Sequence, residues 1–284
     1  MPGTFLQRLV IVFCLVATIA IPLSNAQPSF ASETAGYHWA RKVTPFTVMA
    51  GANLTGDWPS FMKTAVTNWD KNDTVKIKQV SGGTSAQSCN PTTGRIEICN
   101  WNYGTQEGWL GLTRLYFDDS GDHIESATLQ LNDSFFNQKN GQYNDYNARL
   151  HTMCHEMGHT IGLDHVDTTS CMNDSQYAVF HYITPIKKDF KQLANLYKHK
   201  DSTTTVAGKQ KKEKKKKNKK KGGKKNNKKK QEARERAKQR KKEARGKSAK
   251  SASFFDAENL PDETITSETL PDGRTVVTFT TWAE

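Results

Sequence analysis

The chain has 284 residues, with 41 lysine and arginine side chains against 29 aspartate and glutamate side chains and a net charge of +12. This excess belongs to one segment, because residues 201–250 carry a net charge of +19, residues 1–200 carry −1 and residues 251–284 carry −6. The basic segment contains almost no apolar groups and cannot build a second hydrophobic core. The composition therefore excludes a uniformly basic protein and leaves one domain of roughly 160 residues, which is enough for an independent core.

The N-terminus has the pattern of an export signal. Arg8 precedes an apolar run over residues 9–23, and small residues occupy positions 24 and 26. The run is interrupted by Pro22 and is shorter than the roughly 20 residues that span a bilayer. This pattern predicts a cleavable signal peptide over residues 1–26, hence a secreted, extracellular protein without a transmembrane segment in the mature chain. An uncleaved membrane anchor is the alternative. Residues 27–36 are then a short leader.

The cysteines agree with export. One of the five lies within the signal, so the mature chain keeps Cys89, Cys99, Cys154 and Cys171. An even number of cysteines in an exported chain predicts two disulfides, for which three connectivities exist. Binding of a metal by thiolates is the alternative, but no two of these cysteines are closely spaced.

The first half of the domain alternates strand and helix patterns. Residues 44–49 have a strand pattern, and residues 57–72 place apolar side chains at helical spacing. Strands are expected over residues 75–80 and 95–101, separated by a long loop rich in turn-forming residues. Cys89 and Cys99 flank the end of this loop, so a disulfide that pins the two strands as a hairpin is the economical pairing.

Two more strands, residues 109–117 and 123–131, flank an acidic turn over residues 118–122. The carboxylates of this turn are ligands suited to Ca²⁺. A solvated turn is favoured, because the spacing of a calcium-binding EF-hand loop is absent. Asn144 or Asp145 can cap a helix that runs to about Leu163, and Pro185 opens a final helix.

The motif that carries chemistry runs from residue 155 to residue 165, HEMGHTIGLDH. On a helix, His155 and His159 project from one face, one turn apart, where two imidazoles can bind one zinc ion. Glu156 lies beside them and can reach a zinc-bound water without being a ligand. Gly162 can take the left-handed conformation that ends a helix, so that His165 returns to the metal as a third ligand.

Three imidazoles leave one coordination position open, as in catalytic rather than structural zinc sites. Zinc lowers the pKa of its bound water and polarises a carbonyl group, while Glu156 takes the proton as the water attacks and delivers it to the leaving amine. The pattern therefore predicts a zinc-dependent endopeptidase acting on protein or peptide substrates. Solvated histidines on a helix surface are the alternative.

Residues 155–165 resemble the zinc-binding signature of the metzincin metalloproteases, and Met172 fits the methionine of the tight turn that lies beneath the zinc in that family. Within the metzincins, residues 37–199 are most similar to the matrixins, in a short secreted form. The resemblance implies an α+β domain: a twisted, mainly parallel sheet of about five strands, an active-site helix and a C-terminal helix. It also implies that the outer strand, residues 127–132 here, pairs with the extended substrate.

The resemblance has three gaps. Some relatives carry a tyrosine two residues after the turn methionine, where this chain has Asp174. No cysteine stands between Ala26 and Tyr37 to block the zinc as the propeptide does in mammalian matrixins. Their structural zinc and calcium loop is not recognisable either. If the methionine turn packs under the helix, Cys154 and Cys171 come together, and the implied disulfides are Cys154–Cys171 and Cys89–Cys99.

The sequence thus divides into the signal, the leader, a catalytic domain over residues 37–200, a lysine-rich disordered linker over residues 201–252 and an acidic segment over residues 253–284. Strand patterns on both sides of residues 270–273 predict a hairpin in the acidic segment. In an exported protein, residues 208–250 can bind anionic cell-surface or matrix polymers, with a plain solvated linker as the alternative. No specific binding of nucleic acid is expected, because aromatic side chains that stack on bases are absent.

Two classes of function follow from these features. The first is a secreted zinc endopeptidase, and the second is a polyanion-binding secreted protein whose metal domain is vestigial. The presence of all the catalytic positions, Glu156 with His155, His159 and His165, favours the peptidase.

Overall fold

A computed structural model of the chain describes residues 36–119, 121, 123–208 and 264–283. The predicted signal over residues 1–26, nearly all of the leader, the lysine-rich residues 209–252 and the first part of the acidic segment lie outside these described residues. No helix among those described is long and apolar enough to cross a membrane.

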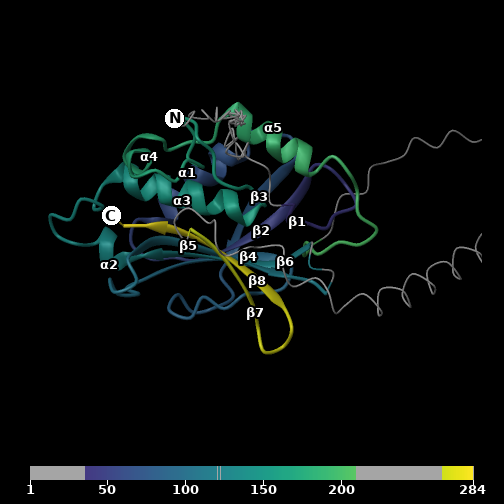
Figure 1. The fold of residues 1–284 in the computed structure, drawn as a ribbon, viewed down its shortest axis with the longest axis horizontal. Helices are drawn as coiled ribbons and strands as arrows, with labels where there is room; N and C mark the ends of the chain where they lie inside the picture. Colours follow the sequence, from purple (N-terminus) through teal and green to yellow (C-terminus); the bar gives the residue numbers. More distant parts are fainter. Residues whose placement is uncertain (1–35, 120, 122, 209–263, 284) are drawn as a thin grey trace, which may run out of the picture. The chain divides into compact units, whose positions relative to one another are not determined.

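The described residues form a mixed sheet whose centre is mostly parallel (Figure 1). The strand order is β3-β2-β4-β6-β5-β8-β7, and the short β1 pairs with β6. Strands β5, β8 and β7 are antiparallel to their neighbours, whereas the other pairs are parallel. The expected sheet of about five strands is therefore extended to eight by β1 and by the C-terminal hairpin. The strands are β1 His38–Trp39, β2 Phe46–Asn53, β3 Val75–Ser81, β4 Arg95–Trp101, β5 Trp109–Phe117, β6 His123–Asn132, β7 Ile265–Thr269 and β8 Thr275–Trp282.

Strands β3 and β4 do not form the expected hairpin. Both pair with β2, one on each side and both in parallel, so β2 lies between them. Parallel neighbours require a crossover, which α1 provides between β2 and β3. The loop between β3 and β4 is long enough to cross β2. The hairpin prediction failed because the length of this loop does not determine whether the strands on either side of it pair with each other.

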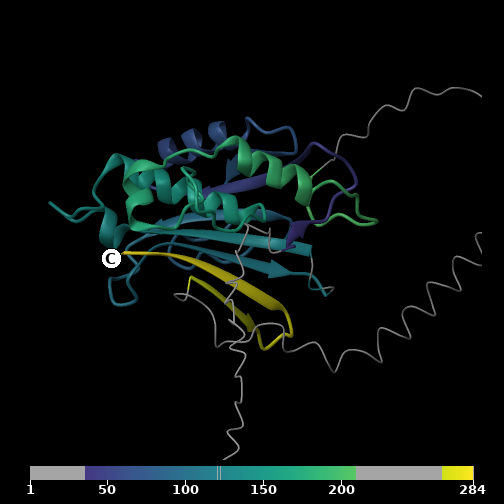
Figure 2. The same ribbon diagram turned by 45° about the horizontal axis from the view of Figure 1, so that its top comes forward.

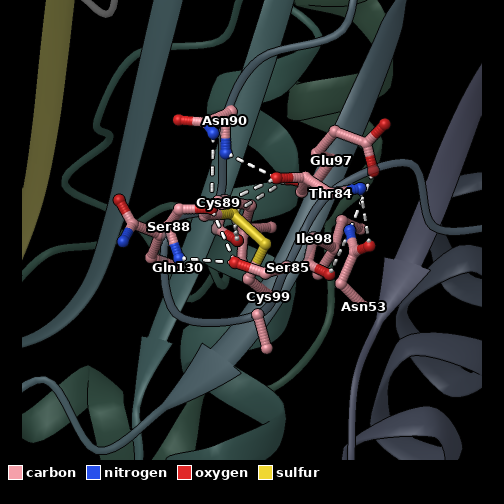
Figure 3. Close-up of a disulfide and its surroundings, with 12 residues drawn as sticks. Asn53, Thr84, Ser85, Ser88, Cys89, Asn90, Glu97, Ile98, Cys99 and Gln130 are labelled. Carbon is pink, nitrogen blue, oxygen red and sulfur yellow. Dashed lines mark hydrogen bonds between the residues drawn. A yellow bond between two sulfur atoms is a disulfide. The ribbon is translucent and has the colours of Figure 1, made fainter.

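The predicted disulfide between Cys89 and Cys99 is present, and it fastens this long loop to β4 (Figure 3). The buried carboxylate of Glu97 holds the start of the same loop, because its Oε2 accepts from Asn53 Nδ2 at 2.8 Å and from Gly83 N at 3.1 Å. The loop, residues 82–94, is thus attached to the buried part of β4 near its start and again at its middle.

The helices α1, α3 and α5 cover one face of the sheet (Figures 1 and 2). They correspond to the three predicted helices, whereas α2 and α4 are short and were not expected. Indole N–H groups tie α3 to its surroundings: Trp39 donates to Thr160 O at 2.8 Å and Trp69 to Cys154 O at 3.0 Å. The helices are α1 Trp58–Trp69, α2 Asp133–Phe136, α3 Tyr146–Thr160, α4 Gln176–His181 and α5 Lys187–Leu196.

The packed domain continues past residue 200, where the linker was expected to begin. Thr205 N donates to Ala40 O at 3.0 Å, Ala207 N donates to Gly94 O at 2.8 Å, and Val206 is buried. Residues 201–207 contain no lysine, and their uncharged β-branched side chains suit an extended segment that packs on the domain. The linker prediction is therefore wrong for these residues.

The C-terminal hairpin is formed by β7 and β8 around the predicted turn, in which Gly273 has a φ of +87°. β8 continues the sheet beyond β5, antiparallel to it. The predicted outer strand, residues 127–132, belongs to β6, which lies inside the sheet between β4 and β5. The prediction that residues 127–132 form the outer strand is therefore wrong. The pattern of polar and apolar residues in β6 does not reveal that β5 pairs with the side of β6 that faces away from β4.

The start of α3 offers a test of the fold. The Asp145 carboxylate accepts from Asn147 N at 2.8 Å and from Ala148 N at 3.0 Å, so it satisfies two backbone donors of the first turn. We expect Asp145→Ala to lower the free energy of unfolding by about 1 kcal/mol in urea denaturation. Asp57 occupies the same position before α1 but makes no side-chain capping bond, so Asp57→Ala should change it much less. Equal losses in the two variants would contradict this account.

Candidate metal centre

Helix α3 and the loop that follows it bring three imidazoles together. His155 and His159 lie one turn apart on α3, with their Nε2 atoms 2.9 Å from each other. The ring of His165, from the loop, has its centroid 5.0 Å from that of His155 and 4.9 Å from that of His159. One nitrogen from each ring lies within 4.8 Å of the other two. The structure therefore gathers the three histidines that the motif predicted.

Gly162 produces the reversal that brings His165 back. Its φ is +92°, a left-handed conformation that favours glycine. Gly162 N donates to His159 O at 2.9 Å and Leu163 N donates to Gly158 O at 3.2 Å, which closes the end of the helix. A Cβ atom at residue 162 would also overlap the carbonyl oxygen of Tyr37. Backbone conformation and packing thus both require glycine here.

Oxygen acceptors hold the outer nitrogen of each ring. His155 Nδ1 donates to Cys171 O and His159 Nδ1 to Leu163 O, each at 2.8 Å, and His165 Nδ1 lies 3.2 Å from the Asp174 carboxylate. This arrangement leaves the Nε2 atoms to face one another, as in metal sites whose ligands are oriented by a second layer of contacts. His165 Nε2 is buried without a hydrogen-bond partner. Three convergent imidazole nitrogens, one of them unsatisfied, fit a zinc ion.

Glu156 lies beside the imidazoles and is fully buried. Its Oε2 accepts from Thr113 Oγ1 and its Oε1 from Thr281 Oγ1, both at 2.6 Å. Burial raises the pKa of Glu156 to about 7, although the hydroxyl hydrogen bonds act in the opposite direction. A carboxyl group with a pKa near neutrality can both accept and release a proton.

Met172 packs against α3 at Gly158. A Cβ atom at Gly158 would overlap the sulfur of Met172 and lie 2.9 Å from the Trp69 ring, so the helix and the loop approach too closely for any larger residue. The predicted disulfide between Cys154 and Cys171 is present and joins the same helix to the same loop. The helix that carries two of the histidines is thus covalently bound to the loop beneath it.

Three polar contacts of this centre were not predicted from the sequence. The sequence marks Asp174 only as the residue that stands in place of a tyrosine, yet its carboxylate pairs with His165, and this hydrogen bond lowers the pKa of Asp174. Thr113 and Thr281 reach Glu156 from β5 and β8. Asp174 could have been suspected from its place two residues after Met172, but no local signal marks the two threonines.

Two other groups near the predicted sites have different partners. His151 lies one turn before His155, and burial lowers its pKa to about 4; its Nδ1 donates to Tyr182 O at 2.7 Å.

In the acidic turn, Asp118 Oδ2 lies 3.1 Å from His123 Nδ1. Residues 120 and 122 lie outside the described part of the chain, so calcium binding by this turn stays a prediction.

Comparison with solved structures adds a distant likeness in fold. No family model matches the chain, and no curated protein does. Among solved structures, the chain is similar to archaemetzincin from Archaeoglobus fulgidus, in a complex with malonate, at 9% sequence identity and a TM-score of 0.32. The match covers 51% of this chain and 98% of the archaemetzincin chain. At this TM-score the likeness carries no argument about the site.

The contact between Asp174 and His165 provides a test of the metal centre. We expect Asp174→Asn to weaken zinc binding about 10- to 100-fold, because it removes the charge that orients the His165 ring. Competition with a chromophoric chelator would measure the affinity. Asp167 lies two residues after His165 in the same loop and is exposed, so Asp167→Asn is the matched control and should change the affinity little. An unchanged affinity in Asp174→Asn would contradict an orienting role.

Proposed function

We propose that the chain is a secreted zinc-dependent endopeptidase, in which His155, His159 and His165 hold the ion and Glu156 is the general base. The observation that carries the proposal is the convergence of three Nε2 atoms beside a buried carboxylate, with an oxygen acceptor on each Nδ1 atom. The matrixin-like metzincin assignment rests on the spacing of residues 155–165 and on Met172. Export rests on the pattern of residues 1–26.

A bound zinc ion would polarise the peptide carbonyl group and lower the pKa of a water molecule beside it. Glu156 accepts a proton from this water as the water oxygen bonds to the carbonyl carbon. It then delivers the proton to the amide nitrogen as the carbon–nitrogen bond breaks. Thr113 fixes Oε2 of the carboxylate, so Oε1, which now accepts from Thr281, is the oxygen available to the water.

Strand β5 is the element that positions the peptide. It passes so close to α3 that a Cβ atom at Gly111 would lie 2.6 Å from Glu156 Oε1. An extended peptide that pairs with the outer side of β5 therefore has its backbone beside the base, and main-chain hydrogen bonds supply affinity at a strand edge. In the structure, β8 of the same chain pairs with this side of β5, in the antiparallel direction.

The test is hydrolysis of casein by the full chain, with and without bound zinc. Zinc removal by a chelator should abolish hydrolysis and added zinc should restore it, because the ion polarises the carbonyl. We expect Glu156→Ala to lower the rate by about 10²- to 10⁴-fold while zinc still binds, because the general base is lost.

Glu268, an exposed glutamate on β7, provides the control, and Glu268→Ala should retain the parent rate. Full activity in Glu156→Ala would show that this glutamate is not the base. Hydrolysis that persists without zinc would exclude the metal mechanism.

A further inference from the structure

A second group of metal-ligating side chains lies away from the first. His38 in β1, His123 at the start of β6 and Asp201 beyond α5 each offer an atom within 4.8 Å of the other two. His199 adds a fourth: its Nε2 lies 3.0 Å from His38 Nε2 and 3.3 Å from Asp201 Oδ1. Residues far apart in the sequence thus place three imidazoles around one carboxylate oxygen.

The spacing within this group fits a tetrahedral ion. The distances to Asp201 Oδ1 are 3.5 Å from His38 Nε2, 3.7 Å from His123 Nε2 and 3.3 Å from His199 Nε2. Bonds of about 2.0–2.1 Å around a tetrahedral zinc ion place its ligand atoms about 3.4 Å apart. Two of these distances are long for hydrogen bonds, yet all three are close to the separation that a shared ion imposes.

The two ring spacings around His38 are similar to those in the first centre. The centroid of His38 lies 4.9 Å from that of His123 and 4.6 Å from that of His199, with interplanar angles of 87° in both cases. The three centroid distances around the first centre fall between 4.6 and 5.0 Å.

Oxygen acceptors orient these side chains too. His38 Nδ1 donates to Gly36 O at 3.0 Å, and His123 Nδ1 lies 3.1 Å from the Asp118 carboxylate. These contacts of the two Nδ1 atoms direct Nε2 of His38 and Nε2 of His123 toward the other members of the group. Arg41 donates to Asp201 Oδ2 from its backbone N at 3.0 Å and from Nη1 at 2.8 Å. The other oxygen of Asp201, Oδ1, is therefore the one that faces the histidines.

An ion pair alone does not account for this arrangement. Asp201 already has a cationic partner in Arg41, whose side chain is fully buried. The three imidazoles nevertheless gather around the other oxygen of the same carboxylate, and His38 is itself buried. A divalent cation held by the three imidazoles and the carboxylate accounts for this convergence on one oxygen.

We propose that His38, His123, His199 and Asp201 bind a second zinc ion. Four protein ligands close its coordination shell, which is the arrangement of a structural rather than a catalytic site. The ion joins the first strand, the start of β6 and the chain that leaves α5. Its role is to fasten both ends of the catalytic domain to the sheet, and it does not depend on peptidase activity.

The test is the zinc content of the full chain after dialysis against zinc alone, measured by elemental analysis. We expect two zinc ions per chain in the parent protein and one in His123→Gln and in His199→Gln, whose side chains are partly and largely exposed. His181, an exposed histidine of α4, is the control, and His181→Gln should keep two ions. His159→Ala should keep one, held by the second site.

Circular dichroism shows whether each variant is folded. A cobalt-loaded His159→Ala variant should give visible absorption bands that are lost when His123→Gln is added. Two outcomes would overturn the second site: zinc content unchanged in both His123→Gln and His199→Gln, or no bound zinc in folded His159→Ala.

The C-terminal hairpin contacts the first metal centre, and the inference drawn from this contact rests on the function proposed above. The ring of Phe279 on β8 stacks on His159, with centroids 4.2 Å apart and an interplanar angle of 16°. Thr281, also on β8, donates to Glu156 Oε1 at 2.6 Å. Phe279 and Thr281 are buried, and Glu156 and His159 have no exposed surface. The hairpin therefore covers the base and one metal ligand.

The backbone of β8 also takes up the edge of β5. The two strands pair from Trp109 opposite Trp282 to Tyr116 opposite Val276. A peptide that added to β5 would need the same backbone groups, and the water that Glu156 activates would need the oxygen that Thr281 occupies.

We infer that the hairpin of β7 and β8 occupies the substrate groove and holds hydrolysis by the full chain at a low basal rate. Displacement of β8 frees the edge of β5 and Oε1 of Glu156 together. Substrate and hairpin then compete for one surface, so weakening the hairpin raises activity.

The test compares the full chain with the double variant Phe279→Ala and Thr281→Val. We expect at least a 10-fold rise in the rate at which the variant cleaves a fluorogenic peptide, and inhibition by an added peptide of residues 264–284. Thr278 on β8 pairs opposite Arg114 and alternates with the two buried side chains, so Thr278→Val is the control and should keep the low basal rate.

A second readout separates this inference from the proposed function. Binding of a peptide hydroxamate to the zinc-loaded chain can be measured by calorimetry whether or not any variant cleaves. Tighter binding by the double variant in the absence of cleavage would support the covered groove while the peptidase proposal fails. Unchanged cleavage together with unchanged hydroxamate affinity would overturn the inference.

Discussion

The structure depends on how closely α3 approaches its neighbours. Three glycines permit this approach: Gly158 against the sulfur of Met172, Gly162 against the carbonyl of Tyr37, and Gly111 of β5 against the carboxylate of Glu156. A Cβ atom at any of the three would collide with the atom opposite it, so helix, loop and strand could not all keep their positions. His155 and His159 are placed by the helix, His165 by the turn at Gly162, and Glu156 by the contact with β5. The whole centre therefore follows from one tightly packed helix.

Such packing buries polar groups, and their burial has to be compensated. Each Nδ1 atom of the three histidines has an oxygen partner, and both oxygens of Glu156 accept from threonine hydroxyls. The inward nitrogens are the exception, with His165 Nε2 left unsatisfied. A cation is the natural partner for that face of the cluster, because a hydrogen bond between two imidazoles can satisfy only one pair at a time. The same reasoning applies to His38 and the residues around it, where Arg41 compensates one oxygen of Asp201 and leaves the other to the histidines.

The sequence could predict those features of the site that depend on residues a few positions apart. The helical interval between His155 and His159 and the turn at Gly162 report local geometry. Both disulfides are present, but the loop flanked by its cysteines predicts only Cys89–Cys99, whereas Cys154–Cys171 was implied by the resemblance to the metzincins. Contacts between distant elements leave no such pattern. Asp174 lies nine residues beyond His165, Thr113 and Thr281 come from other strands, and His38 and Asp201 are separated by most of the domain. The error about residues 127–132 has the same origin, because a strand with two buried faces reads alike whether or not another strand lies beside it. The acidic charge of the C-terminal segment likewise says nothing of where it docks.

The docking of the C-terminal hairpin on β5 also follows from a general property of edge strands in β-sheets. An uncovered edge strand exposes unpaired backbone donors and acceptors, which bind any extended chain of suitable shape. This property makes β5 fit to hold a peptide beside Glu156, and it makes β5 fit to hold β8. Recognition and its block therefore use the same hydrogen-bonding groups, and neither can be strengthened at β5 without strengthening the other. Side chains are what distinguish the two occupants: Phe279 on the ring of His159 and Thr281 on Glu156 give β8 contacts that a peptide without those side chains lacks. The balance between this block and turnover is thus set by β8, whose residues can change without altering the catalytic groups.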